Sequence, residues 1–283
     1  MTELSERIYS SRSQLCTPIK MLRSMIADLI ACRELAWRLF VRNIRAQYRQ
    51  TFFGYAWLLL PPIFTTIIWV YLNKTKILSV GETSIPYPVY VLVGTLLWQS
   101  FVKSVSHPIQ QVQQNKSVIS KLNFPKEAII LSSFGEMLFN CIVQLLVLIP
   151  VFIWFKIPVS TAVVLAPVGI LAMLGAGTTL GQLLLPLGSL YKDVTKGLPL
   201  VLRAWFFLTP IVYPKPESGF PALLANINPV TPLVDTTRAW LTGGDAGSVL
   251  PFFAVAVIIL LLFLVGWIMM RLSMPPIIER MNA

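Results

Sequence analysis

The sequence predicts an all-α protein that crosses a membrane several times. Of its 283 residues, 55% are hydrophobic and only 12% are charged, which lies outside the range of soluble domains. The mean hydropathy is +0.71, and uncharged stretches long enough to cross a hydrocarbon core of about 30 Å recur along the chain. A basic amphipathic segment lies directly before the first of these stretches and predicts the orientation of the chain.

Residues 1–49 are expected to form a cytoplasmic region that contains an amphipathic interfacial helix. Thr17 followed by Pro18 is typical of a helix start. If residues 33–49 are helical, they carry a charged stripe of Glu34, Arg38, Arg42, Arg45 and Arg49 beside an apolar stripe of Trp37, Phe40, Val41, Ile44 and Tyr48. Such a helix fits the headgroup layer, where arginines meet lipid phosphates. Packing of the apolar stripe on protein is the alternative.

The first span is predicted over residues 50–73, because no charge occurs between Arg49 and Lys74. Pro61 and Pro62 lie in its middle and predict a kink on a side that faces neighbouring helices. The first 30 residues lack the small-residue cleavage site of a signal peptide, so the N-terminus is expected to stay in the cytoplasm.

Hydropathy predicts four more spans, over residues 84–106, 128–155, 159–187 and 248–270. Residues 197–214 are ambiguous because Arg203 interrupts an apolar run. The cytoplasmic side receives 18 of the 23 Lys and Arg residues with either five or six spans, so the positive-inside rule does not choose. Prolines break residues 216–246, which we expect to form two short external re-entrant or interfacial helices. Residues 272–283 are expected to be a cytoplasmic tail.

Several function classes are excluded by missing motifs. The glycines at 175, 177 and 181 precede Gln182 where a phosphate-binding loop needs lysine, so they are better explained by close helix packing. Glu136 and Asp193 are isolated acids, and the single histidine and three cysteines have no metal-binding spacing, so neither an enzyme nor a metal site is expected. His107 is expected to mark the cytoplasmic end of the second span, with a ligand or proton-relay role as the alternative. The net charge of +11 is better explained by anionic lipid than by nucleic acid.

The energy for transport is expected to come from a partner protein, because acids are nearly absent from the spans. Two polar cytoplasmic segments, residues 103–126 and 190–196, are candidate contacts for such a partner, with solvated loops as the alternative. The residues chosen as contacts are Lys116, Lys121, Lys192 and Asp193.

Aromatic residues gather at two places, where their rings offer flat apolar faces to sugars. Anchoring at the membrane interface is the alternative. The candidate sugar-binding residues at the first span are Tyr48, Phe52, Tyr55 and Trp57. Those within the ambiguous segment 197–214 are Trp205, Phe206 and Tyr213.

Four groups of residues, taken in order, carry a resemblance to a known family. They are Tyr48-x2-Thr51-x2-Gly54-x2-Trp57-x3-Pro61; Phe124-Pro125-Lys126-Glu127; Tyr191-Lys192-Asp193-Val194 with Thr209-Pro210-Ile211-Val212-Tyr213-Pro214; and Asn228-Pro229 with Arg238. Over about residues 35–270 the pattern resembles the permease subunits of type-2 ABC exporters, which carry polysaccharides across the bacterial cytoplasmic (inner) membrane. About 30 preceding residues lie outside the matching part.

The resemblance implies six spans with both termini in the cytoplasm and a homodimer of permeases. It also implies two separate ATPase subunits, which bind ATP and Mg, and a lipid-diphosphate-linked glycan of O-antigen or capsule type as cargo. Arg45 and Arg49 are then a candidate site for the diphosphate headgroup, because a guanidinium can donate two hydrogen bonds to one phosphate. Binding of bulk anionic lipid is the alternative. Export of teichoic acid, export of a smaller lipid or drug, and a glycan-processing enzyme are the other functions considered.

Overall fold

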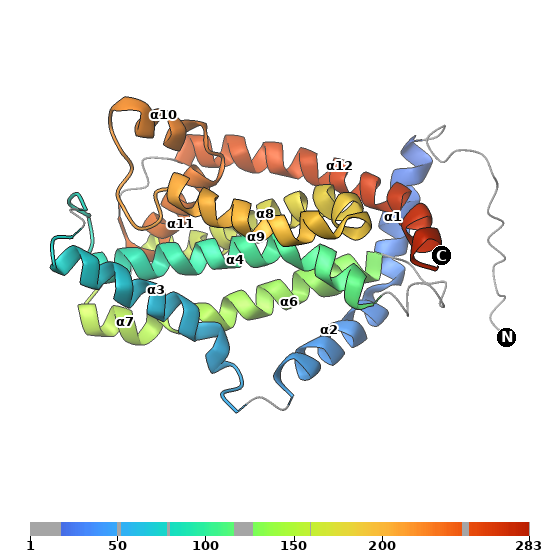
Figure 1. Ribbon diagram of the computed structural model, residues 1–283, viewed down its shortest axis with the longest axis horizontal. Helices are drawn as coiled ribbons and strands as arrows, with labels where there is room; N and C mark the ends of the chain where they lie inside the picture. The colour runs from blue at the N-terminus through green and yellow to red at the C-terminus, as the bar shows by residue number, and fades with distance from the viewer. Residues whose placement is uncertain are drawn as a thin grey trace.

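The computed structural model describes residues 18–49, 52–77, 80–115, 127–158, 160–244 and 249–282. Within these residues the chain is a long helical bundle without strands, which confirms the all-α prediction (Figure 1). In chain order the elements are α1 (Pro18–Ala31), α2 (Arg33–Tyr48), α3 (Ala56–Lys74), α4 (Tyr87–Gln114), α6 (Glu127–Leu145), α7 (Leu148–Phe155), η2 (Thr161–Leu165), α8 (Ala166–Leu190), α9 (Lys192–Leu208), α10 (Gly219–Ile227), α11 (Val230–Thr242) and α12 (Val249–Asn282).

Five helical segments in the described residues are long and apolar enough to cross a membrane. They are Ala56–Lys74, Tyr87–Gln114, Glu127–Phe155, Thr161–Leu190 and Val249–Pro275. Each overlaps one of the five stretches predicted from hydropathy, so the chain is a multi-pass membrane protein. Residues 197–208 of the ambiguous segment lie in α9, which begins at Lys192 and has only 17 residues, and residues 209–214 lie beyond the end of this helix.

The second span is longer than predicted. Its helix, α4, continues past Pro108 to Gln114, so the predictions of a loop from Lys103 and of a helix end at His107 are wrong. The extra turns persist because their polar side chains find partners on α2 and α6, as described below. Lys116 and Lys121 lie outside the described residues.

The last helix also continues further than predicted. α12 has 34 residues and includes most of the expected tail over residues 272–283. Met274 and Ile277 are almost completely buried, in a cluster with Ile109 and Ile129. Burial of these apolar side chains stabilises the helix beyond the span.

The first span begins at Ala56, six residues later than predicted, and contains both prolines inside the helix. Pro62 is buried and Pro61 is exposed, so one of the two faces the neighbouring helices. The hydroxyl groups of Thr65 and Thr66 donate to the carbonyl oxygens of Pro61 and Pro62, each at 2.8 Å.

The centre of the bundle is the contact between α4 and α8, where glycines let the two helices approach closely. A Cβ atom on Gly177 would lie 2.6 Å from the carbonyl oxygen of Phe101, and one on Gly181 would lie 2.5 Å from that of Val105. Nothing lies within 4 Å of the corresponding position at Gly175. Two of the three predicted packing glycines therefore lie at the contact, and the third does not.

Residues 195–213 follow α4 along its whole length. At one end, the amide of Gln113 donates to the hydroxyl oxygen of Thr195 at 3.3 Å. At the other end, the hydroxyl groups of Tyr87 and Tyr90 donate to the carbonyl oxygens of Val212 and Tyr213 at 3.0 and 3.1 Å. At 1.5 Å per residue, Tyr87 and Gln113 are about 39 Å apart along the helix. α9 and the residues after it therefore cover a distance similar to the membrane thickness.

The end of the bundle that carries α10 and α11 is held by buried polar side chains. Arg238, on α11, is only 5% exposed and donates to the carbonyl oxygens of Pro210 and Ile211, both at 3.1 Å. Asn228 accepts from the indole of Trp205 at 3.1 Å and donates to Thr209 at 2.8 Å. Burial raises the pKa of the Asp235 carboxyl, although Arg238 and then Lys215 oppose that shift. These contacts pack α11 against the bundle, and the two short helices predicted within residues 216–246 are present.

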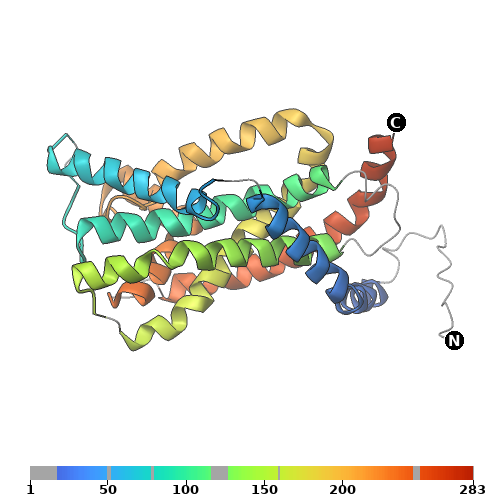
Figure 2. The same ribbon diagram turned by 90° about the horizontal axis from the view of Figure 1, so that it is seen from below.

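The opposite end carries α1, α2 and the end of α12 (Figures 1 and 2). Arg271 of α12 donates to Asp28 of α1 at 3.0 Å and to Glu127 of α6 at 3.1 Å. Between α1 and α2, desolvation by burial, followed in size by the charge of Glu127, raises the pKa of the Cys32 thiol to about 11. This thiol is therefore neutral at pH 7 and poorly reactive.

Candidate functional site

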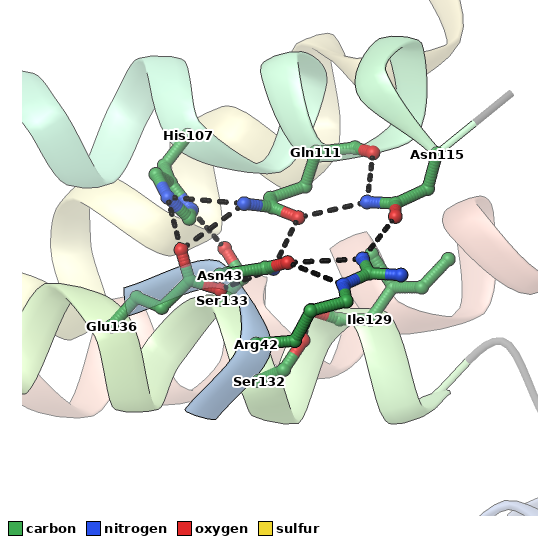
Figure 3. A network of polar contacts seen from close by, with 9 residues as sticks. All are labelled: Arg42, Asn43, His107, Gln111, Asn115, Ile129, Ser132, Ser133 and Glu136. Atoms are coloured by element: carbon green, nitrogen blue, oxygen red, sulfur yellow. Dashed lines mark hydrogen bonds and ion pairs between the residues drawn. The ribbon is translucent and has the colours of Figure 1, made fainter. Parts of the chain in front are cut away.

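A buried polar network joins α2 to α4 and α6 (Figure 3). Glu136 of α6 is 2% exposed. Its carboxylate accepts from the amide of Asn43 on α2 at 2.7 Å and from the amide of Gln111 on α4 at 3.1 Å. The amide of Asn43 also donates to Gln111, at 3.1 Å. These bonds compensate the loss of hydration that a buried carboxylate would otherwise suffer.

The network continues toward both ends of α4. On one side, a ring nitrogen of His107 lies 3.1 Å from Glu136, and the other is hydrogen bonded to Ser133. On the other side, Asn115 donates to Gln111 at 2.9 Å and accepts from Arg42 at 2.6 Å. His107 therefore belongs to this polar network, and its ring is held by Ser133 and Glu136.

The apolar stripe of α2 is shared between α6 and the outside of the bundle. Ile44 is buried, and Phe40 lies edge-on to Phe139 of α6 with a centroid distance of 6.2 Å. Trp37 remains 64% exposed. α2 therefore packs on protein through part of the stripe and leaves Trp37, Arg45 and Arg49 exposed.

Two cavities lie beside α2. A polar cavity of about 610 Å³ lies between α2, α4 and α6, and its lining includes Asn43, His107 and Glu136. A basic cavity of about 500 Å³ lies against α2 and is lined by Trp37, Arg38, Val41, Arg42, Arg45, Ala46 and Arg49. Ala46 lines both cavities. Both volumes fall in the range of small-molecule sites, about 300–1,000 Å³.

The arginines of the basic cavity differ in their partners. Arg38 forms an exposed ion pair with Glu34 at 2.6 Å, and Arg42 belongs to the polar network. Among the described residues, the guanidinium groups of Arg45 and Arg49 have no hydrogen-bond or ion-pair partner, and both side chains are exposed. The two residues chosen from the sequence as a headgroup site thus lie in one cavity with free donors.

The aromatic residues chosen from the sequence fall into two groups. Phe52, Tyr55 and Trp57 are 95%, 44% and 56% exposed around the start of α3, and the side chain of Tyr48 lies outside the described part of the structure. In the second group, Trp205 lies 5.6 Å from Phe101 and Phe206 lies 6.0 Å from Trp98, measured between ring centroids. The hydroxyl of Tyr213 donates to the carbonyl oxygen of Phe207 at 2.7 Å. The first group is accessible, whereas Trp205 and Phe206 pack largely within the chain.

The described contact candidates for a partner protein are Lys192 and Asp193. Both are exposed at the start of α9. The hydrogen bond from Gln113 to Thr195 places them near the end of α4, on the end of the bundle that also carries α2. In the described residues, no group of three or more His, Cys, Asp or Glu side chains could hold a metal ion.

Sequence reasoning missed the network between α2, α4 and α6. One signal was present, because His107, Gln111 and Asn115 are spaced four residues apart and share a face if the helix continues. Glu136 was recognised only as an isolated acid. Its partners come from residues 93 and 25 positions away along the chain, and local patterns do not show such pairings.

The bundle and its arginine-bearing helix agree with a known transporter family. Residues 34–242 match the ABC-2 type transporter family, which is more than half of the chain, so the protein belongs to this family. The predicted family resemblance is confirmed.

The relatives of the chain come from two bacteria. The O-antigen export system permease protein RfbA of Myxococcus xanthus is 27% identical over 244 residues, covering 83% of this chain and 92% of that protein. Two proteins of the same name from Klebsiella pneumoniae are 22% and 21% identical, each covering 70% of this chain and 75% of the relative.

Proposed function

We propose that the chain is the permease subunit of an ABC exporter that moves a lipid-linked polysaccharide, of O-antigen or capsule type, across the bacterial cytoplasmic membrane. The observation that carries the proposal is the match to an O-antigen export permease over 92% of that relative's length. Membership of the ABC-2 family supports a transport role in which the ATP-hydrolysing site lies on other subunits. We propose two copies of this chain and two ATPase subunits, which bind ATP and Mg.

A sixth crossing by α9 is part of the proposal. Its 17 residues span about 25 Å, and residues 209–213 continue the chain to the Tyr87 end of α4. The contacts with Gln113 and Tyr87 at the two ends of α4 support a complete crossing. Six crossings put both termini on one side. The positive-inside rule favours the cytoplasm for the end with α1 and α2, which carries most of the basic residues.

The basic cavity supports a membrane-anchored phosphate as part of the cargo. Arg45 and Arg49 are exposed and have no partner among the described residues. α2 ends at Tyr48, eight residues before α3 begins at Ala56. A planar guanidinium can donate two hydrogen bonds to one phosphate and keeps its charge at any physiological pH. The exposed rings of Phe52, Tyr55 and Trp57 follow directly along the chain and offer apolar faces for sugar rings.

The test uses the chain purified with the ATPase that a neighbouring reading frame encodes. ATP hydrolysis by this complex is measured with a lipid-linked glycan and, separately, with hydrophobic drugs. We expect stimulation by the glycan. Stimulation by drugs alone would favour export of a smaller lipid or drug, and glycan processing without any ATPase subunit would favour an enzyme.

A further inference from the structure

The lining of the polar cavity includes a lysine that has no counter-ion among the residues that the structure describes. Lys103 lines this cavity and is partly buried in α4. Lys103 lies 11 residues before Gln114, the last residue of α4, so it is about 16 Å from this end of the helix. In the described part of the chain its ammonium group has neither a hydrogen bond nor an ion pair. An unpaired cation at such a depth is costly unless a polar cavity or an anion compensates it.

The acid in the same cavity does not neutralise this lysine. Glu136 accepts from Asn43 and Gln111 and is paired with His107, and its carboxylate forms no ion pair with Lys103 within 4 Å. Lys103 therefore lines the cavity without an acidic side chain that pairs with it in the described part of the chain.

The rest of the lining suits an oxygen-rich anion. Gln47, Gln110 and Gln114 line the cavity and are exposed, and each amide can donate two hydrogen bonds. Hydrogen bonds from neutral amides and from an ammonium group stabilise an oxyanion, and the charge-assisted bonds are the stronger ones. Ala46 separates this cavity from the basic cavity, whose positive charge favours the approach of an anion.

We propose that the polar cavity binds a phosphate group, with Lys103 as its counter-charge and glutamine amides as additional donors. This inference goes beyond the proposed function, because it concerns a cavity distinct from the arginine site and does not depend on the exported cargo. The phosphate belongs either to a lipid headgroup that enters from the side of α2 or to a free phosphate ion. Both share the chemistry that the lining recognises.

The experiment measures ligand binding by the shift in thermal unfolding of the complete chain in detergent. The probes are dioctanoyl phosphatidic acid, dioctanoylglycerol without phosphate, and inorganic phosphate at constant ionic strength. All proteins carry Arg45→Gln and Arg49→Gln, so that the basic cavity does not mask the signal. We compare Lys103→Met and Lys103→Arg, with Lys74→Met at the other end of the bundle as the matched control.

We expect a phosphate-bearing probe to stabilise the protein and to bind at least tenfold more weakly to the Lys103→Met variant. Binding should be largely retained with Lys103→Arg and unchanged with Lys74→Met. Stabilisation by phosphatidic acid alone assigns a lipid headgroup, and stabilisation by inorganic phosphate assigns the free ion. Equal binding to Lys103→Met and its parent, or no stabilisation of the parent by either phosphate probe, would overturn the proposal.

A second variant tests the same site if the Lys103→Met variant does not fold. Removal of an unpaired buried charge is expected to leave the ligand-free protein at least as stable as its parent. If the variant nevertheless does not fold, Gln110→Ala with Gln114→Ala tests the exposed side of the same cavity. Phosphate binding that is unchanged by this double substitution would also refute the proposed site.

Discussion

At the scale of single residues, the arginines of the basic cavity differ in their hydrogen-bond and ion-pair partners. Arg42 is held in the polar network by Asn115, and Arg38 pairs with Glu34 on the exposed surface, where an ion pair contributes little to stability. Arg45 and Arg49 have no such partner among the described residues. They are therefore the arginines of the basic cavity that are available to a phosphate, and Arg33 lies outside this cavity.

Replacing both Arg45 and Arg49 by lysine tests their role. The variant keeps the positive charge that orients the protein but loses the paired hydrogen bonds of the guanidinium. We expect normal membrane insertion and an export rate reduced at least tenfold, measured as surface glycan per inserted protein. Arg33→Lys on the same helix, outside the basic cavity, is the control. Surface glycan at the wild-type rate would leave only a role in orientation and bulk lipid binding.

At the scale of elements, the bundle depends on close contact between α4 and α8. Gly177 and Gly181 face backbone oxygens of α4 at distances that leave no room for a methyl group, whereas Gly175 faces open space. Small residues have this role wherever helices meet in a membrane. The effect of the same substitution can therefore be compared between two glycines at the contact and one outside it.

Alanine at Gly177 or Gly181 should separate the two helices and destabilise the protein by about 1–3 kcal/mol, the usual cost of overpacking. Alanine at Gly175 should have almost no effect. Thermal unfolding of the purified variants in detergent measures the difference. Equal stability of all three variants would show that the α4–α8 contact tolerates a wider spacing.

The side of the membrane that α10 faces is tested by cysteine labelling. Ser218 is exposed directly before α10 and avoids the positive φ of 79° at Gly219, where a side chain would be strained. In a background without Cys16, Cys32 and Cys141, Ser218→Cys should react with an impermeant thiol reagent in intact spheroplasts. Lys196→Cys, near the opposite end, should react only after permeabilisation. The reverse pattern would invert the proposed orientation.

At the scale of the whole molecule, α1, α2 and the end of α12 form one layer at an end of the bundle. Arg271 links α12, α1 and α6 there, and the network around Glu136 links α6 to α2 and α4. Lys192 and Asp193 are exposed near the same end. A protein docked on this end would therefore contact elements that are rigidly connected to the spans.

We expect a tagged chain to co-purify with the neighbouring ATPase, with two copies of each subunit by native mass spectrometry. Charge reversal at Lys116 and Lys121 should reduce the amount of bound ATPase several-fold, since exposed charges contribute to docking through complementary charges. Charge reversal at Lys74 and Lys76, at the opposite end of the bundle, is the control. Undiminished ATPase binding by the first variant would exclude these two lysines from the interface.

The sequence by itself determined the helical class, five of the membrane-crossing segments, the arginine-bearing helix and the family. The first three features depend on local composition and periodicity, whereas the family is indicated by the resemblance of four groups of residues taken in order. Only the tertiary structure decided that α4 continues to Gln114, that residues 195–213 follow α4 over its whole length, and that Trp205 packs inside the chain. It also decided that Asn43, Gln111 and Glu136 are in contact. The tertiary structure likewise places Lys103 in the lining of a cavity, with no counter-ion for the lysine among the described residues. The physical reason is that a buried polar group is satisfied by whichever remote helix lies beside it, and the pattern of its own helix does not specify that neighbour.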